Sequence, residues 1–209
     1  MQYFAMNKQA RARQFMKGQP NSIYTEVFPD EDFGDSGYWF WLKSAGAHGF
    51  DVKAFDRTNV YIRSTELTWN DNTTFKRFNH DLPIAPRCVA PGAAGAEIQI
   101  ADTNFQYFAY CAPYKSSNLA NATTTVDASV PMDVGGNVGE QSTRVLHHRY
   151  LCDSTFHNCV DEEQFFLAKG FGLWQWKHFQ SGGLVNSALM NDLEAGSATA
   201  TLPCPQSYQ

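Results

Sequence analysis

Two short aromatic runs constrain the fold of this chain more than any other feature. One is Tyr-Trp-Phe-Trp-Leu-Lys at 38–43, and the other is Gly-Leu-Trp-Gln-Trp-Lys-His-Phe at 172–179. Each run contains two Trp residues spaced two positions apart, which places both on the same face of a β-strand. Because aromatic side chains suit a pleated, half-buried surface, both runs predict β-strands.

Further strand-like segments follow along the chain, separated by turn signals. They are found at about 50–56, 59–69, 73–78, 96–100, 105–111, 143–151, 163–169 and 184–190. Together with the aromatic runs they predict an all-β fold, a two-sheet β-sandwich of jelly-roll-like type, with a closed β-barrel as the alternative. The turn Gln180-Ser181-Gly182-Gly183 predicts a hairpin between the last two strands.

Two other segments are expected to lie outside the sheets. Residues 4–17 are good helix formers and are followed by Gly18 and Pro20, which predicts one short N-terminal helix. Residues 1–37 would then form a helix-plus-loop extension that packs on the domain. The segment 112–139 is poor in large apolar residues and is expected to be a long surface excursion.

Composition favours a single folded domain over residues 1–209. Aromatic residues make up 14% of the chain and charged residues 18%, which excludes disorder throughout. The net charge of −5 argues against a general nucleic-acid-binding protein. No apolar run approaches the length of about 18 residues that a membrane-spanning helix needs, so no membrane span is expected.

The chain has five cysteines, whose spacing does not decide how they pair. We favour a Cys152–Cys159 disulfide, which would staple a hairpin end, and a second disulfide between Cys88 and Cys111, with Cys204 left over. Disulfides persist in oxidising compartments, so we expect a secreted or periplasmic protein. The alternative is a cytosolic protein with five reduced thiols.

Aromatic residues are the first candidates for ligand binding. Sugar rings have apolar C–H faces, so flat indole rings beside hydrogen-bonding groups make a serviceable glycan platform. The alternative for each Trp is an ordinary place in the core. The predicted substrate-binding residues are Trp39, Trp41, Trp69, Tyr61 and Arg63.

The second aromatic run has its own pattern. Alternation places Trp174, Trp176 and His178 on one face of the strand, opposite a mixed face that includes Gln175 and Lys177. Because the mixed face is the more polar one, we expect the Trp face of this strand to be buried.

Acidic residues on two expected strands are the candidate catalytic groups. Glu66 shares a strand face with apolar Val60 and Ile62, so partial burial would favour its protonated form. If segments 50–56 and 59–69 are neighbours, Asp56 could face Glu66, or Asp51 could face Arg63. Two carboxylates across a groove suit glycoside hydrolysis, whereas a Tyr/Arg/His/Asp set suits recognition of anionic sugars or β-elimination at a uronic acid. The alternative is that these acids are structural partners of nearby Lys or Arg.

No cofactor is indicated, although two segments allow a metal. The patch of His147, His148, Cys152, His157 and Cys159 could hold zinc in a metal-dependent enzyme, but a disulfide would remove both thiolates. Carboxylates crowded into the loop 29–35 could bind calcium, but the EF-hand spacing is absent.

These features predict a secreted carbohydrate-active protein that binds polysaccharide or oligosaccharide in an aromatic-lined groove. If it is an enzyme, we expect glycoside hydrolase or polysaccharide lyase chemistry. The chain has no Gly-x-Ser-x-Gly elbow, phosphate-binding glycine-rich loop or His-Glu-x-x-His motif. The alternatives are a non-catalytic structural or adhesion β-sandwich, and the metal-dependent enzyme. The sequence leaves the oligomeric state open.

Overall fold

The computed structural model describes the backbone over most of the chain and the side chains over a smaller part. Backbone is described for residues 10–16, 19–27, 37–44, 49–55, 59–68, 74–86, 97–109, 112–135 and 138–195. Side chains are described for 83, 97–101, 104, 106–109, 112–116, 121–135 and 138–189. Residues 138–189 carry most of the site that follows.

The described backbone is built from thirteen strands. They are β1 (Ala10–Met16), β2 (Gln19–Val27), β3 (Gly37–Ser44), β4 (Gly49–Phe55), β5 (Asn59–Thr68), β6 (Thr74–Pro86), β7 (Ile98–Ala109), β8 (Ala112–Val126), β9 (Val130–Asp133), β10 (Glu140–Cys152), β11 (Cys159–Ala168), β12 (Gly172–Gln180) and β13 (Gly183–Ala195). Both aromatic runs lie on strands, β3 and β12, as predicted.

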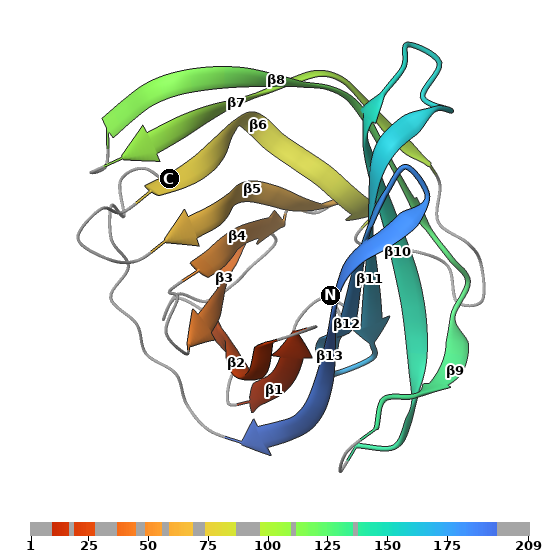
Figure 1. Cartoon of the computed structure of the whole chain (residues 1–209). Helices are drawn as coiled ribbons and strands as arrows, with labels where there is room; N and C mark the ends of the chain where they lie inside the picture. Colours follow the sequence, from red (N-terminus) through yellow and green to blue (C-terminus); the bar gives the residue numbers. More distant parts are fainter. Residues whose placement is uncertain are drawn as a thin grey trace.

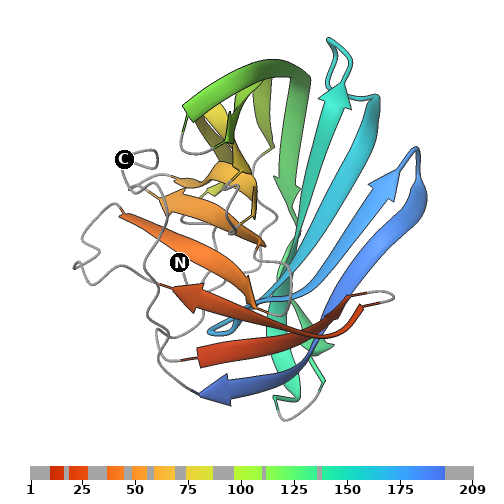
Figure 2. The same cartoon turned by 60° about the vertical axis from the view of Figure 1, so that its left-hand side comes forward.

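The strands pair in one continuous order, in which nearly every strand lies beside its neighbour in the chain. That order is β11-β12-β13-β1-β2-β3-β4-β5-β6-β7-β8-β10-β9, and β11 also pairs with β10. The sheet therefore curls, so that β3–β7 lie across from β10–β13 (Figure 1). Figure 2 shows the two layers inclined to each other. The all-β prediction is confirmed, and the facing layers are consistent with the predicted β-sandwich.

The N-terminal segment differs from the expected helix and loop. Residues 10–16 form β1, which pairs with both β2 and β13, and residues 19–27 form β2. Hydrogen bonding to a strand on each side outweighs the modest helix propensity of this segment, because propensity is only a weak prior. Residues 1–9, 17–18 and 28–36 of the expected extension lie outside the described residues, and so does the acidic loop 29–35 considered for calcium.

The segment 112–139 is not the surface excursion that its composition predicted. Residues 112–126 form β8, which pairs with β7 and β10, and β9 pairs with β10. Thr123 and Thr124 are buried there, as are Ala122 and Val126. Small and β-branched side chains fit between two neighbouring strands, so strand pairing does not require large apolar residues here.

The predicted hairpin between β12 and β13 is confirmed. Gln180 and Gly183 are register partners, and the two residues between them have positive φ angles, 47° at Ser181 and 79° at Gly182. Positive φ at both central positions is the geometry of a type I′ turn, whose twist matches that of the flanking strands. Glycine at the second position adopts this geometry without steric cost.

A small apolar cluster lies on one side of β10–β12. It consists of Val134, Val145, Phe166, Ala168 and Trp174, with Met132, Val138 and Phe171 packed against it. The remaining buried residues include Leu146 on β10 and Val126 on β8. The described part of the chain contains no helix long and apolar enough to cross a membrane.

Candidate functional site

Three neighbouring antiparallel strands, β10, β11 and β12, carry the best-defined group of polar and aromatic side chains. Tyr150 on β10 is the register partner of Asp161 on β11, and Glu163 on β11 is the partner of both His148 and His178. Directly opposed residues point to the same side of a sheet, so these five residues share one face, here called the Tyr150 face.

The other side of the same strands, here called the Glu162 face, carries charged residues. Arg149 and Glu162 are register partners, as are Gln164 and Lys177. Charged side chains are typical of an outer surface. On the Tyr150 face, Leu146 and His148 of β10 are buried.

His178 is the centre of the Tyr150 face. Its Nε2 lies 3.4 Å from the hydroxyl oxygen of Tyr150 and 3.7 Å from Oδ1 of Asp161. The imidazole also stacks on the indole of Trp176, with ring centroids 6.1 Å apart and planes inclined by 27°. Both polar contacts are long for a hydrogen bond, so the ring is held mainly by stacking.

Behind this ring, β10 and β8 hold a second histidine. His148 is buried, and its Nδ1 lies 2.8 Å from the hydroxyl oxygen of Thr124. Its ring lies 5.7 Å from that of Tyr150. Tyr150 thus lies beside a buried, hydrogen-bonded histidine on one side and reaches toward the more exposed His178 on the other.

Asp161 is unusual because it is buried and one of its oxygens makes no hydrogen bond. The residue is 8% exposed, and Oδ1 has no hydrogen-bond partner among the described residues. The nearest cationic candidate is His178, which pairs with it only when protonated. A buried carboxylate oxygen without a partner costs free energy, so its presence calls for a functional explanation.

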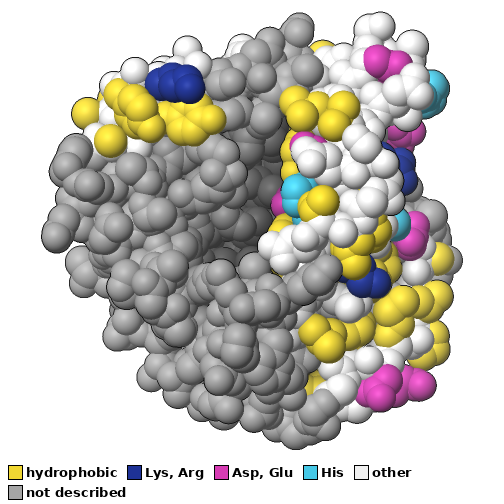
Figure 3. Space-filling model, in the orientation of Figure 1, with side chains coloured by type: hydrophobic (Ala, Val, Ile, Leu, Met, Phe, Trp, Pro, Cys, Tyr) yellow, Lys and Arg dark blue, Asp and Glu magenta, His cyan; other side chains and the backbone are white. Residues whose placement is uncertain are grey.

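The aromatic part of the Tyr150 face is partly open. The side chain of His178 is 25% exposed, and Tyr150 and Trp176 are half-buried. Figure 3 shows that the molecule is hollowed beside the described strands, and that histidine, acidic and hydrophobic side chains gather at the edge of this hollow. The ring stack is therefore partly accessible to a ligand from solvent.

The Glu162 face has short contacts instead. Glu162 Oε1 lies 2.8 Å from Nδ1 of His147 and accepts a hydrogen bond from Gln164 at 2.7 Å, and its Oε2 accepts one from Arg149 at 3.0 Å. His147 Nε2 lies 3.1 Å from Oδ2 of Asp127. Burial raises the pKa of Glu162, but the hydrogen bonds from His147, Gln164 and Arg149 outweigh burial and leave the pKa below its ordinary value.

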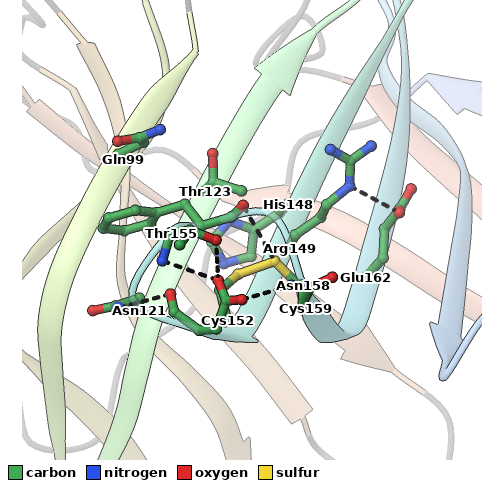
Figure 4. Close-up of a disulfide and its surroundings, with 12 residues drawn as sticks. Gln99, Asn121, Thr123, His148, Arg149, Cys152, Thr155, Asn158, Cys159 and Glu162 are labelled. Atoms are coloured by element: carbon green, nitrogen blue, oxygen red, sulfur yellow. Dashed lines mark hydrogen bonds and ion pairs between the residues drawn. A yellow bond between two sulfur atoms is a disulfide. The ribbon is translucent and has the colours of Figure 1, made fainter.

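The hairpin end between β10 and β11 is stapled as predicted. A disulfide joins Cys152 and Cys159, which are register partners (Figure 4). Inside the loop, Asp153 accepts hydrogen bonds from the side chains of Asn158 at 2.6 Å and Thr155 at 2.7 Å. These bonds hold the pKa of Asp153 far below its ordinary value.

The zinc alternative for this segment is wrong as far as it depends on the two cysteines. Both thiols are consumed by the disulfide, so neither can be a thiolate ligand. His147 and His148 lie on opposite faces of β10 and contact different partners. No group of three or more His, Cys, Asp and Glu residues in the described part of the chain is arranged to hold a metal ion.

The expectation that Trp174 shares a face with Trp176 is wrong, and a β-bulge is the reason. The register between β11 and β12 shifts at Phe166/Leu167, which leaves Trp174 as the extra residue on β12. Trp174 is buried as expected, but it packs edge-on against Phe166, at 5.9 Å between ring centroids, in the apolar cluster. Trp176 pairs with Phe165 on the Tyr150 face.

Most of the predicted catalytic and sugar-binding residues lie on β3, β4 and β5, which are adjacent antiparallel strands. Trp41 and Asp51 are register partners there, and β4 and β5 are neighbours as the acid hypothesis required. For these strands the structure describes the backbone but not the side chains, and for several other candidate residues it describes neither. The candidates with described backbone only are Trp39, Trp41, Asp51, Tyr61, Arg63 and Glu66. The candidates that lie wholly outside the described residues are Asp56, Trp69, Cys88, Cys111 and Cys204.

Sequence reasoning missed Tyr150 and Asp161, although one signal was available. If Cys152 and Cys159 face each other at the end of an antiparallel hairpin, then counting back two residues on each strand pairs Tyr150 with Asp161. The structure has this register.

Comparison with known proteins gives little. No family model matches the chain, and no curated protein matches it. A solved structure from Bacteroides fragilis, described as that of a proposed exported protein with a YmcC-like fold, is 8% identical, with a TM-score of 0.47 over 92% of this chain and 98% of that chain. At this identity and score, the likeness assigns neither a family nor an activity.

Proposed function

We propose that this is a secreted protein that binds polysaccharide through the rings of Trp176 and His178. The observation that carries the proposal is the stack of these two rings beside the Tyr150 hydroxyl and the Asp161 carboxylate. A sugar ring can pack its C–H face on the indole while its hydroxyl groups bond to neighbouring polar groups. The disulfide between Cys152 and Cys159 supports an oxidising compartment.

Cleavage of the bound polysaccharide is the finer part of the proposal. The adjacency of β4 and β5 supports a pair of carboxylates drawn from Asp51, Asp56 and Glu66, which would act as a glycoside hydrolase. Tyr150 and His178 supply the groups that elimination at a uronic acid would need, which would make the protein a polysaccharide lyase. Release of reducing ends separates either enzyme from a binding protein, and absorbance of the new C=C bond marks the lyase.

A structural or adhesion role is the second candidate, because apolar side chains are exposed near the β12–β13 turn. Val160, Leu184 and Val185 are 47%, 45% and 48% exposed. Such residues suit contact with another protein.

The test is binding to a panel of plant, algal and microbial polysaccharides, read by a glycan array and by intrinsic Trp fluorescence. We expect Trp176→Ala to lose binding to whichever polysaccharide the native protein retains. Val185→Ala is the matched control, because Val185 is exposed on the neighbouring strand and should leave binding intact. Absence of binding across the panel would reject the proposal and leave the structural role.

A further inference from the structure

We propose that glycan binding at the Trp176–His178 stack is switched by protonation of His178, through an exchange of partners at one ring nitrogen. The ligand in this inference rests on the proposed function, but the exchange of partners does not. It follows from where Tyr150 and Asp161 lie around the imidazole.

Both polar neighbours of His178 approach the same atom. The Tyr150 hydroxyl oxygen lies 3.4 Å from Nε2, and Asp161 Oδ1 lies 3.7 Å from Nε2. A ring nitrogen without a proton can accept a hydrogen bond from the Tyr150 hydroxyl, whereas a ring nitrogen with a proton can donate a hydrogen bond to Asp161. The two hydrogen bonds therefore exclude each other.

This geometry also differs from that of a catalytic triad. In a triad of nucleophile, histidine and carboxylate, the outer members contact opposite ring nitrogens, so that a proton taken at one is balanced by the carboxylate at the other. Tyr150 and Asp161 compete for one nitrogen instead. The arrangement therefore works as an either/or switch.

Asp161 gives the switch its driving force. Its Oδ1 is buried without a hydrogen bond among the described residues, and a protonated Nε2 would supply the missing donor. Charge-assisted N–H···O bonds shorten to about 2.8 Å, so closing the 3.7 Å gap moves the imidazole by roughly 1 Å. That movement breaks the alignment of His178 with Trp176 and should weaken stacking on a sugar.

The charged and titratable groups around His178 decide which variants can serve as controls. On β11, two carboxylates lie on the side of His178: Asp161, and Glu163, which is the register partner of His178. On β10, Tyr150 and the buried His148 face the same side, and His148 is a second histidine on this face. On β13, the register partner of His178 is Asn186, which does not titrate. Within the described strands, His148 is thus the residue that a control must remove.

The exchange is tested first without a ligand. The nitrogen and ring-proton chemical shifts of His178 are followed by NMR from about pH 8 to about pH 5, the range in which histidines change charge. We expect Nε2 to gain a proton and a carboxylate acceptor, and Tyr150→Phe to leave the acid form unchanged. Asp161→Asn should remove the carboxylate signature, and His148→Gln should not. A His178 ring with the same acid-form shifts in Asp161→Asn would overturn the inference.

The consequence for the ligand is then measured with a polysaccharide that binds the native protein. We expect binding to be about tenfold weaker at about pH 5 than at about pH 8, which corresponds to about 1.4 kcal/mol. His178→Gln cannot titrate, so it should bind equally at both pH values, and His148→Gln should keep the native pH dependence.

The two proposals fail differently. Equal native affinity at both pH values would overturn the switch and leave the proposed function intact. The same pH dependence in His178→Gln would also overturn the switch. Absence of any binding, with the NMR exchange present, would reject the proposed function and leave the exchange intact.

Discussion

The two faces of β10–β12 differ in how completely their charged groups are satisfied. On the Glu162 face, the contacts of Glu162 with His147, Gln164 and Arg149 are 2.7 to 3.0 Å long. On the Tyr150 face, the two polar contacts of His178 are 3.4 and 3.7 Å long, and a buried oxygen of Asp161 makes no hydrogen bond among the described residues.

The same three strands supply both faces, so strand geometry does not explain the difference. Short hydrogen bonds from several donors offset the free energy that a carboxylate loses when it is removed from water. A structural network needs this compensation. A buried oxygen without a hydrogen-bond donor carries a free-energy cost. A protonated neighbour or a ligand that donates a hydrogen bond to it would remove that cost. The comparison therefore assigns stability to the Glu162 face, and it supports the proposal that the Tyr150 face binds a ligand.

The largest expected effect separates the two faces through their tryptophans. Trp174→Ala removes a buried ring from the apolar cluster and should lower the free energy of unfolding by about 3 kcal/mol or more. Trp176→Ala removes a half-buried ring and should cost about 1 kcal/mol while abolishing polysaccharide binding. Urea unfolding of both variants measures this. Equal losses of stability would mean that the two faces are equally structural.

The disulfide gives the next largest effect. Replacing Cys152 and Cys159 together by Ser should lower stability by about 2.5 kcal/mol, because the unfolded chain regains the entropy of the short loop. The tip has its own hydrogen bonds through Asp153, so we expect the register of β10 and β11 to survive. Amide hydrogen exchange across the two strands checks this. Loss of protection at Tyr150 and Asp161 would show that the staple holds the site itself.

A smaller effect is expected from the Glu162 network, with a defined pH dependence. The pKa of Glu162 is lower in the folded protein, so its contribution is fully present above its ordinary value of 4.5 and is lost as the pH falls through the lower folded value. Glu162→Gln should cost about 1 kcal/mol near neutral pH and less in acid. The measurement is urea unfolding at several pH values, with the exposed Glu140→Gln as the control. A loss that does not shrink in acid would contradict this assignment.

Many of the strands could be predicted from residue patterns, because the alternation of side chains along a β-strand is a local property of the sequence. The aromatic runs, the hairpin at Ser181-Gly182 and the staple at Cys152 and Cys159 all follow from short-range chemistry. The register of Tyr150 with Asp161 could also have been derived from that staple.

The rest depends on long-range pairing that local patterns do not contain. Residues 10–16 have helix-forming side chains but form β1, because β2 and β13 supply hydrogen bonds on both edges. The bulge at Trp174 moves this residue to the face opposite Trp176, while the residues after it keep their predicted alternation, and a period of two does not contain the bulge. The burial of Asp161 Oδ1 without a hydrogen bond depends on the packing of three strands, so local sequence patterns cannot predict it.

The smallest expected effect has the opposite sign on the Tyr150 face and is therefore the sharpest test of the comparison. Asp161→Asn keeps the shape of the side chain but removes a buried charge that lacks a hydrogen bond at Oδ1. Near neutral pH we expect stability to be unchanged or to rise by up to about 1 kcal/mol, because the amide is cheaper to bury and can donate to His178. Urea unfolding of Asp161→Asn and Glu162→Gln under the same conditions compares the two changes in unfolding free energy directly. If Asp161→Asn is as destabilising as Glu162→Gln, then Asp161 is already satisfied, and the Tyr150 face holds no reserve of free energy for a ligand or a proton.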